Sequence, residues 1–328
     1  MGKPLISVIV TAYNRKEFLS QAVSSALRQT LPREFYEVIV VKNFEEREID
    51  RRLEESGVRS ILSEAPEQGE HLAAALEEAK GEVLSFLDDD DKFSTGKLEA
   101  VRSAFRREGV VFHRNRRAFI DAGGRLIGGE APRPAFEARG SDPGALRKLI
   151  GLGMGVNSSA MSIRRSALDA IGVERFRRVR LAVDSLYFVA ALLQGGILVY
   201  DPRPLTLFRV HGNQSFINTG SIDAYTRRRC DSARKFVSGY GELMKIVGGT
   251  PYEVAVKPLL IRSRIVSAVF CQSESKPTAR ELMYLLKQRQ NNDPLYFLLL
   301  LGLEAACVLP PLRGPAIRVE YELARAIR

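Results

Sequence analysis

The chain has 328 residues, of which 45% are hydrophobic, and this content is typical of a globular protein with a buried core rather than of a disordered one. Its 49 basic and 39 acidic residues leave a formal charge of +10, which favours an anionic partner such as a nucleotide phosphate, a nucleic acid or an acidic membrane surface without choosing among them. Cys230, Cys271 and Cys307 are odd in number and show no CxxC spacing, so the sequence indicates neither a disulfide framework nor a zinc site.

The predicted location is cytoplasmic. A reducing compartment fits the cysteine pattern. The first residues pass directly into a strand-like run, without the charged region and long apolar stretch of a secretion signal.

Strand-like and helix-like segments alternate in the first 115 residues. Residues 5–10 are apolar and β-rich, as in a strand buried on both faces of a parallel sheet, and a polar loop follows at 11–15. Asn14 and Glu17 resemble a capping box for the next helix. Further strands are predicted at 38–41, 58–62, 82–87 and 110–112, and further helices at 46–55, 71–80 and 97–107. The alternation indicates right-handed βαβ units in which ligands bind at the carboxyl ends of the strands.

The following hundred residues are less regular. Residues 121–144 are rich in glycine and proline and are predicted to form an irregular connection. Helices are expected at 143–151, 164–171 and 184–194, and strands at 156–163, 197–200 and 205–210.

From about residue 221 onward the pattern is helical, which predicts an appended helical extension. Its candidate helices are 222–246, 253–270, 279–289, 294–309 and 315–327. The segment 294–309 approaches the length of a bilayer span but contains Glu304 and ends in two prolines. It fits a buried or interface helix, an interfacial membrane anchor, or a spanning helix.

Four consecutive carboxylates, Asp88 to Asp91, end the apolar run at 82–87. Adjacent anions repel and raise one another's pKa, so such a cluster calls for a neutralising cation, and hard oxygen ligands suit Mg²⁺ or Mn²⁺. The alternative is a solvated acidic turn that caps the next helix.

Taken together, these segments resemble a family 2 glycosyltransferase of the GT-A fold over residues 5–215. Residues 6–15 resemble the opening strand and nucleotide-binding loop of that family, and residues 80–91 resemble its DXD segment. Residues 159–188 are similar to the acceptor-side region that carries the catalytic aspartate, and residues 207–211 resemble the Arg-x-His that closes the catalytic domain.

The resemblance implies an α/β fold with a Rossmann-like, mostly parallel central sheet flanked by helices, followed by the all-helical extension. Residues 1–220 would form the catalytic domain, with a nucleotide-sugar-binding half at 1–115 and an acceptor-binding half at 116–220. Residues 221–328 would form the extension, which is a candidate for membrane association.

The implied activity is inverting, metal-dependent transfer of a sugar (EC class 2.4) from a nucleoside-diphosphate sugar to a hydroxyl acceptor, with Mn²⁺ or Mg²⁺ as cofactor. The acceptor would be a saccharide or a lipid-linked saccharide, and no nucleic acid is expected as partner. An acidic membrane surface is a further candidate partner, which would place the protein peripherally on the inner face of the cell membrane.

The resemblance also assigns candidate site residues. Asp184 is the candidate general base, and a plain N-cap is its structural alternative. Asp90 and His211 are the candidate metal ligands, and His211 has the alternative of a packed histidine at a strand end. Asp91 would support the cluster. The candidate nucleotide-sugar-binding residues are Thr11, Ala12, Tyr13, Arg15, Asn43, Asp88, Asp89 and Arg209.

Three positions depart from the family pattern. The base-binding aspartate after the second strand is replaced by Lys42 and Asn43, and Val183 stands where an acidic residue often precedes the catalytic aspartate. The usual Arg-Asn or Leu-Asn pair is absent from 69–81. A diverged, inactive transferase that acts as a membrane-peripheral binding protein is therefore the alternative function. Nucleotidyl transfer is disfavoured because residues 11–15 contain no glycine.

Overall fold

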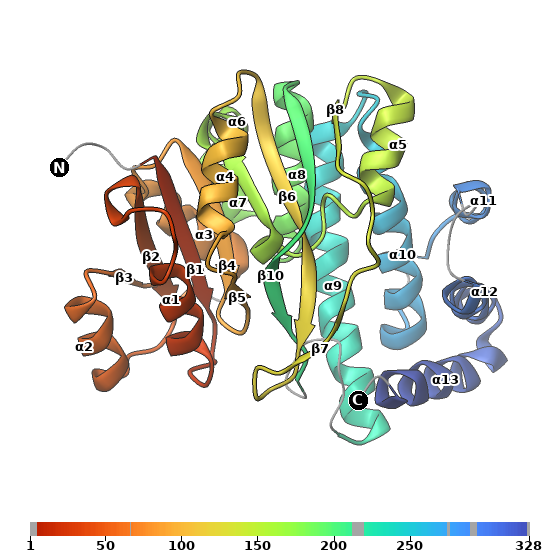
Figure 1. The fold of residues 1–328 in the computed structure, drawn as a ribbon. Helices are drawn as coiled ribbons and strands as arrows, with labels where there is room; N and C mark the ends of the chain where they lie inside the picture. The colour runs from red at the N-terminus through yellow and green to blue at the C-terminus, as the bar shows by residue number, and fades with distance from the viewer. Residues whose placement is uncertain (1–4, 66, 212–219, 274–275, 289–293, 327–328) are drawn as a thin grey trace. The chain divides into compact units, whose positions relative to one another are not determined.

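A computed structural model describes residues 5–65, 67–211, 220–273, 276–288 and 294–326 (Figure 1). The chain forms two compact units, Met1–Val210 and His211–Arg328.

The first unit is built on a ten-stranded sheet in which the main strand order is β3-β2-β1-β4-β9-β6-β10-β5. Its first half is parallel, as the βαβ pattern predicts. The strands of this half are β1 (Ile6–Ala12), β2 (Tyr36–Lys42), β3 (Arg59–Leu62) and β4 (Val83–Asp88). β1 and β4 are almost wholly buried, which explains their continuous apolar sequences.

The helices of this half begin and end near the predicted residues. They are α1 (Leu19–Leu27), α2 (Arg47–Glu55), α3 (Gln68–Glu78) and α4 (Lys97–Phe105), and a 3-10 turn, Arg33–Phe35, precedes β2. Val8, Val10, Leu19 and Val23 are among the buried residues that form a core between the sheet and its helices. Apolar burial of this kind contributes roughly 25 cal/mol per Å².

The second half of the sheet is mixed. β9 (Met161–Arg164) lies antiparallel between β4 and β6 (Val110–Ile120), so β4 and β6 run in the same direction. β10 (Ile197–Arg209) is parallel to β6. The carboxyl ends of β1, β4, β6 and β10 therefore lie at one edge of the sheet.

Several predicted boundaries in this half are wrong. The strand expected at 110–112 is eleven residues long, and the two strands expected at 197–200 and 205–210 are a single strand. β10 shifts register on both sides of Pro204, because proline donates no backbone hydrogen bond. The strand expected at 156–163 is a 3-10 turn, Ser158–Ala160, followed by β9.

The irregular connection at 121–144 contains two short strands. These are β7 (Leu126–Gly129), paired with β6, and β8 (Phe136–Arg139), paired with β10. A two-residue strand, β5 (Lys92–Phe93), pairs with the end of β10. The remaining helices are α5 (Pro143–Gly151), α6 (Arg165–Ile171), α7 (Val173–Arg177) and α8 (Val183–Gln194).

The second unit is helical in its described residues. Its helices are α9 (Ile222–Val247), α10 (Glu253–Cys271), α11 (Ala279–Gln288), α12 (Pro294–Val308) and α13 (Arg313–Ala326), with a 3-10 turn at Pro310–Leu312. Tyr225, Ile261, Ile265 and Leu303 are among its buried core residues.

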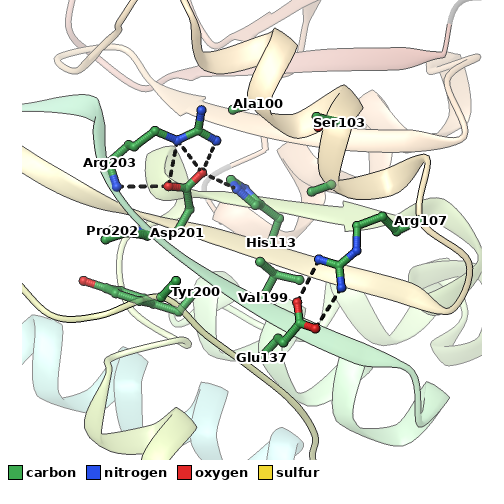
Figure 2. Close-up of a pocket in the computed structure, with 12 residues that line it drawn as sticks. Ala100, Ser103, Arg107, His113, Glu137, Val199, Tyr200, Asp201, Pro202 and Arg203 are labelled. Carbon is green, nitrogen blue, oxygen red and sulfur yellow. Dashed lines mark hydrogen bonds and ion pairs between the residues drawn. The ribbon is translucent and has the colours of Figure 1, made fainter.

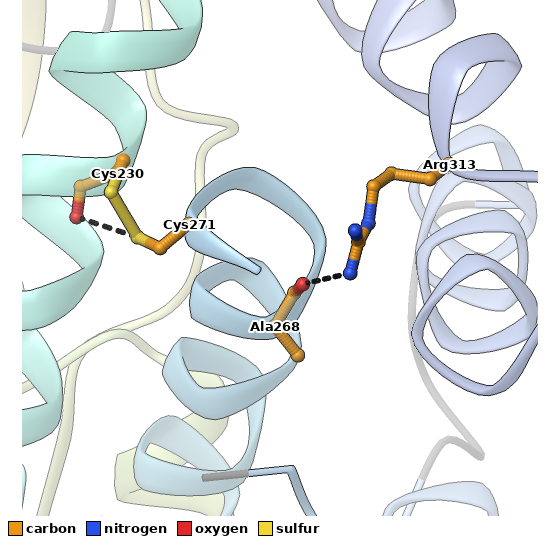
Figure 3. The surroundings of a disulfide bond; sticks show 4 residues. All are labelled: Cys230, Ala268, Cys271 and Arg313. Atoms are coloured by element: carbon orange, nitrogen blue, oxygen red, sulfur yellow. Dashed lines mark hydrogen bonds between the residues drawn. A yellow bond between two sulfur atoms is a disulfide. The ribbon is translucent and has the colours of Figure 1, made fainter. Parts of the chain in front are cut away.

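A disulfide joins Cys230 on α9 to Cys271 on α10 (Figure 3). The expectation of no disulfide is therefore wrong. The two cysteines are 41 residues apart in sequence, and helix packing brings their Cα atoms to 5.0 Å, a proximity that spacing rules cannot show. Cys307 is a buried free thiol.

Among the helices in the described ranges, none has the length and apolar character needed to cross a membrane.

Candidate functional site

The acidic run forms a buried turn directly after β4. Asp89, Asp90 and Asp91 are 2%, 7% and 1% exposed, so these three are not a solvated acidic turn. The amide of Asp89 donates to the carbonyl of Thr11 at 3.2 Å, which ties the turn to the end of β1. The predicted convergence of the β1 and β4 carboxyl ends is thus present in the fold.

Arg15 forms ion pairs with two carboxylates of this turn. Its Nη2 lies 2.5 Å from Asp89 Oδ1, and its Nη1 lies 2.5 Å from Asp90 Oδ2. The Arg15 side chain is one-third exposed, so one face of the ion pair reaches the surface. Arg209 is a second cation at this turn, so two guanidinium charges face four neighbouring carboxylates.

The cluster is electrostatically strained without a further cation. Burial raises the pKa of Asp89 to about 7 and the pKa of Asp91 to about 6, and the neighbouring aspartates add to both effects. Burial and the same neighbours hold the pKa of Asp88 well above its usual range. Asp89 Oδ2 is buried without a hydrogen-bond partner. These oxygen donors fit a hard divalent cation.

The described residues nevertheless hold no group of three or more His, Cys, Asp or Glu side chains arranged as a metal-binding shell. Asp90 lies in the turn, held by Arg15. His211 is buried two residues beyond Arg209, and its part in metal binding stays a prediction.

Asp91 holds the turn in place. Its Oδ1 accepts from the backbone amide of Arg209 at 2.9 Å, and its Oδ2 accepts from Asn157 Nδ2 at 3.3 Å. Asp88 is fixed through its own amide, which donates to Ser159 Oγ at 3.0 Å. The four carboxylates therefore have unequal roles.

Arg209 braces the same turn from β10. Its Nε donates to the carbonyl of Asp90 at 2.8 Å, Nη1 to the carbonyl of Ala122 at 2.7 Å, and Nη2 to Gln21 Oε1 at 2.9 Å. The side chain is fully buried over the ring of Phe18. The structure shows Arg209 as a brace, and its contact with a nucleotide sugar stays a prediction.

Asp184 lies in the first turn of α8, where it is partly exposed. Its Oδ1 accepts from the amide of Ser185 at 2.8 Å, and its Oδ2 accepts from the amide of Asn157 at 3.1 Å. Burial raises its pKa, and these backbone bonds oppose that rise. Asn157 thus contacts both Asp91 and Asp184, and it does so in the left-handed region, at φ 65°.

The donor-side loop differs in detail from its prediction. Thr11 and Ala12 are the last residues of β1, and Tyr13 is 43% exposed with its ring edge-on to His71. Asn14 does not begin a capping box, because α1 starts at Leu19 without a side-chain cap.

Asn14 instead pairs with Asn43. The Asn14 amide donates to Asn43 Oδ1 at 2.8 Å, and Asn43 Nδ2 donates to Asn14 Oδ1 at 2.9 Å. Asn43 Oδ1 keeps one further lone pair, and Asn43 Nδ2 keeps one further N–H. The side chain can therefore contact a nucleobase edge while it stays paired with Asn14.

Two residues that support the site escaped prediction. Asn157 gave no signal, because its role depends on a left-handed backbone and distant partners. Lys97 is fully buried, and its Nζ donates to Asn115 Oδ1 and to the carbonyl of Ser159. Burial lowers the pKa of Lys97 to about 7. The sequence offered one signal for a buried Lys97, which is that it directly precedes Leu98 on the apolar stripe of α4.

A pocket of about 250 Å³ lies apart from this cluster, between α4, β6 and β10 (Figure 2). Asp201 accepts there from Arg203 and lies 3.3 Å from His113, while Arg107 pairs with Glu137. None of the predicted site residues lines this pocket.

Comparison with known proteins agrees with the resemblance. The family model for glycosyl transferase family 2 matches residues 7–172. An uncharacterized glycosyltransferase of Nostoc sp. is 23% identical over 248 residues, which cover 72% of this chain and 74% of the relative. The putative teichuronic acid biosynthesis glycosyltransferase TuaG of Bacillus subtilis is 35% identical over 103 residues, which cover 30% of this chain and 40% of TuaG.

Solved structures share the fold. S. aureus TarS 1-349 in complex with UDP-GlcNAc matches with a TM-score of 0.55 at 15% identity, over 97% of this chain and 90% of that one. The mannosyltransferase PcManGT from Pyrobaculum calidifontis, in complex with GDP-Man and Mn²⁺, matches with a TM-score of 0.55 at 16% identity, over 99% of this chain and 87% of that one.

Proposed function

The chain belongs to glycosyltransferase family 2 and is a glycosyltransferase, and from this premise we propose that it is an inverting, metal-dependent enzyme. It moves a sugar from a nucleoside-diphosphate sugar to a hydroxyl of a saccharide or lipid-linked saccharide. The observation that carries the proposal is Asn157, which contacts Asp91 in the acidic turn at 3.3 Å and Asp184 at 3.1 Å.

Asp184 is the general base. As the acceptor oxygen bonds to the anomeric carbon, its proton passes to a carboxylate oxygen of Asp184, and the bond to the diphosphate breaks with its electron pair on the leaving group. Attack from the face opposite the leaving group inverts the anomeric centre. Burial raises the pKa of Asp184 and makes it a better proton acceptor.

Asp90, with His211, is the proposed ligand set for Mn²⁺ or Mg²⁺, a cation that would stabilise the negative charge of the departing diphosphate. Arg15 offers the diphosphate a planar guanidinium with paired donors. Tyr13 and Asn43 follow β1 and β2 directly and are the proposed contacts with the nucleobase. UDP-GlcNAc and GDP-mannose are the first donors to test, because fold relatives bind them.

The test is donor hydrolysis and transfer with Mn²⁺ and Mg²⁺. We expect Asp184→Asn to lower turnover by roughly 10²- to 10⁴-fold while leaving donor binding intact, as for loss of a general base. Asp90→Ala should abolish metal-dependent donor binding. Asp169→Asn is the matched control, because Asp169 is exposed on α6.

NMR of the transferred sugar should show an inverted anomer, and retention of configuration would refute the mechanism. Failure of all common nucleotide sugars, with no metal-dependent nucleotide binding in calorimetry, would favour the inactive binding protein.

The second unit supports a peripheral membrane position as part of the proposal. Residues 211–328 contain 17 basic and 10 acidic residues, so this unit carries most of the excess positive charge. Val308, Leu309 and Leu312 are 60%, 53% and 41% exposed where α12 ends. Exposed apolar side chains on a basic unit favour binding to acidic lipid.

Flotation with vesicles containing phosphatidylserine tests this position. Leu309→Asp should reduce co-flotation, whereas Leu126→Asp, at a more exposed leucine of β7, should not. Equal flotation of both variants and the wild type would remove the membrane from the proposal.

A further inference from the structure

A basic cluster lies on β6 and shares a single carboxylate. Arg114 Nη2 donates to Glu130 Oε1 at 2.6 Å, and Arg117 Nε donates to the same oxygen at 3.0 Å. Arg116 Nη1 donates to the carbonyl of Glu130 at 3.1 Å. Two guanidinium groups thus share one carboxylate, which leaves an excess of one positive charge, and the third guanidinium bonds only to a backbone carbonyl.

The cluster is largely shielded from water. The side chains of Arg114 and Arg117 are 2% and 14% exposed, and that of Glu130 is 19% exposed. Like charges held at low exposure cost free energy unless a counter-charge offsets them. Such a cluster therefore favours an anionic ligand.

Arg117 is the more exposed of the two guanidinium groups that share the Glu130 carboxylate. Its Nε and Nη2 bond to Glu130, and its guanidinium stands 4.9 Å from the centre of the Phe208 ring. No hydrogen bond joins Nη1 to another residue in the described parts of the chain. The guanidinium is thus held rigidly with one donor group to spare.

Two stretches of the chain lead from this cluster to residues of the proposed site. Phe208 directly precedes Arg209, whose amide donates to Asp91. A Cβ atom at Gly153 would lie 3.7 Å from Arg114 Nη2, and the chain runs from there to Asn157, which contacts Asp184. Burial raises the pKa of Asp184, backbone hydrogen bonds oppose that rise, and the charge of Arg117 opposes it to a smaller extent.

We propose that Arg117 is a specificity-determining residue that selects acceptors carrying a carboxylate or phosphate near the reactive hydroxyl. The anionic group binds Arg117 Nη1, and the hydroxyl then lies toward Asp184. This inference rests on the proposed transferase function, to which it adds the chemical class of the acceptor.

The test is calorimetric binding of three matched probes to the full chain, without turnover. The probes are methyl β-D-glucuronide, methyl β-D-glucoside 6-phosphate and neutral methyl β-D-glucoside. We expect at least one anionic probe to bind about tenfold more tightly than the neutral one, the size of a hydrogen bond to a charged partner. Which of the two binds more tightly distinguishes carboxylate from phosphate.

Variants assign the preference to a residue. Arg117→Gln should abolish it, Arg117→Lys should retain part of it, and Arg147→Gln, at an exposed arginine of α5, should leave it unchanged. If Arg117→Gln does not fold, two other results test the inference. Arg117→Lys should retain part of the anionic preference, and high salt should weaken the preference of the wild type. Absence of both effects would contradict the inference. Loss of the preference in Arg15→Gln instead of Arg117→Gln would place the anion at the donor site and overturn the inference.

Equal binding of all three probes by the wild type would also overturn it. Turnover of a donor without any anionic preference would refute the inference alone. An anionic preference without turnover of any donor would refute the proposed function alone.

Discussion

Replacing Asp89 by asparagine tests whether the acidic turn is a strained site that awaits a cation. Burial raises the pKa of Asp89 from 3.8 to about 7, so between these values the folded chain binds more protons than the unfolded chain. The contribution of Asp89 to the free energy of unfolding therefore falls as the pH rises from about 4 to 7. At about 1.4 kcal/mol per unit, Asp89 alone accounts for about 4 kcal/mol. Asp91, with a pKa of about 6, adds to the same trend.

Hydrogen exchange of β4 amides in urea, with a chelator present, measures the free energy of unfolding of the first unit alone. We expect a clear decline from pH 4.5 to 7 in the wild type, a much shallower decline in Asp89→Asn, and an unchanged one in Glu99→Gln, a control at an exposed position of α4. Titration of Lys97 affects the free energy of unfolding only above about pH 7, because its pKa is lowered from 10.5 to about 7 in the folded chain.

Adding Mn²⁺ should restore more stability at pH 7 than at pH 5, because protons compete with the cation for the carboxylates. An equal pH slope in wild type and Asp89→Asn, or an equal effect of Mn²⁺ at both pH values, would refute the reasoning.

Three further predictions concern Asn157, Arg15 and the Cys230–Cys271 disulfide. Asn157→Ala should lower the free energy of unfolding by about 1–2 kcal/mol more than Asn157→Gly, because only glycine adopts φ 65° without strain; equal values in urea unfolding would contradict this. Arg15→Gln should strengthen binding of Mn²⁺ alone in calorimetry, because Arg15 forms an ion pair with Asp90. The same variant should weaken binding of a nucleoside diphosphate. A parallel loss of both affinities would count against this prediction. Cys230→Ser should cost the helical unit about 4 kcal/mol by chain entropy for a loop of 41 residues, and reduction of the Cys230–Cys271 bond should have the same effect on urea unfolding.

The parallel half of the sheet was predictable because each strand is a short apolar run that ends in a polar loop. β6 and β10 were predicted only in part, because their polar positions resemble those of a loop. β6 carries Arg114, Arg116 and Arg117, whose charges the distant Glu130 partly offsets, and β10 contains two prolines. Tertiary pairing overrode local propensity in both strands.

In the site, too, local features were predictable from the sequence and features that depend on distant residues were not. The acidic turn was visible as four adjacent carboxylates, and its burial follows from its place after a buried strand. The bridge through Asn157 was not visible, because a left-handed residue and two partners distant in sequence leave no periodic pattern. The disulfide escaped for a related reason, since its cysteines meet only through helix packing.

The geometry gives three of the four carboxylates in the turn different roles. Asp91 accepts from the amide of Arg209 and from Asn157, so it holds the turn in place. Asp89 and Asp90 both face Arg15, which offers them one positive charge through a fork of two donors. A diphosphate presents Arg15 with the same kind of paired oxygens, so an arriving donor can draw Arg15 away from Asp90. Release of Asp90 then leaves its carboxylate for the cation, and donor and metal binding should strengthen each other.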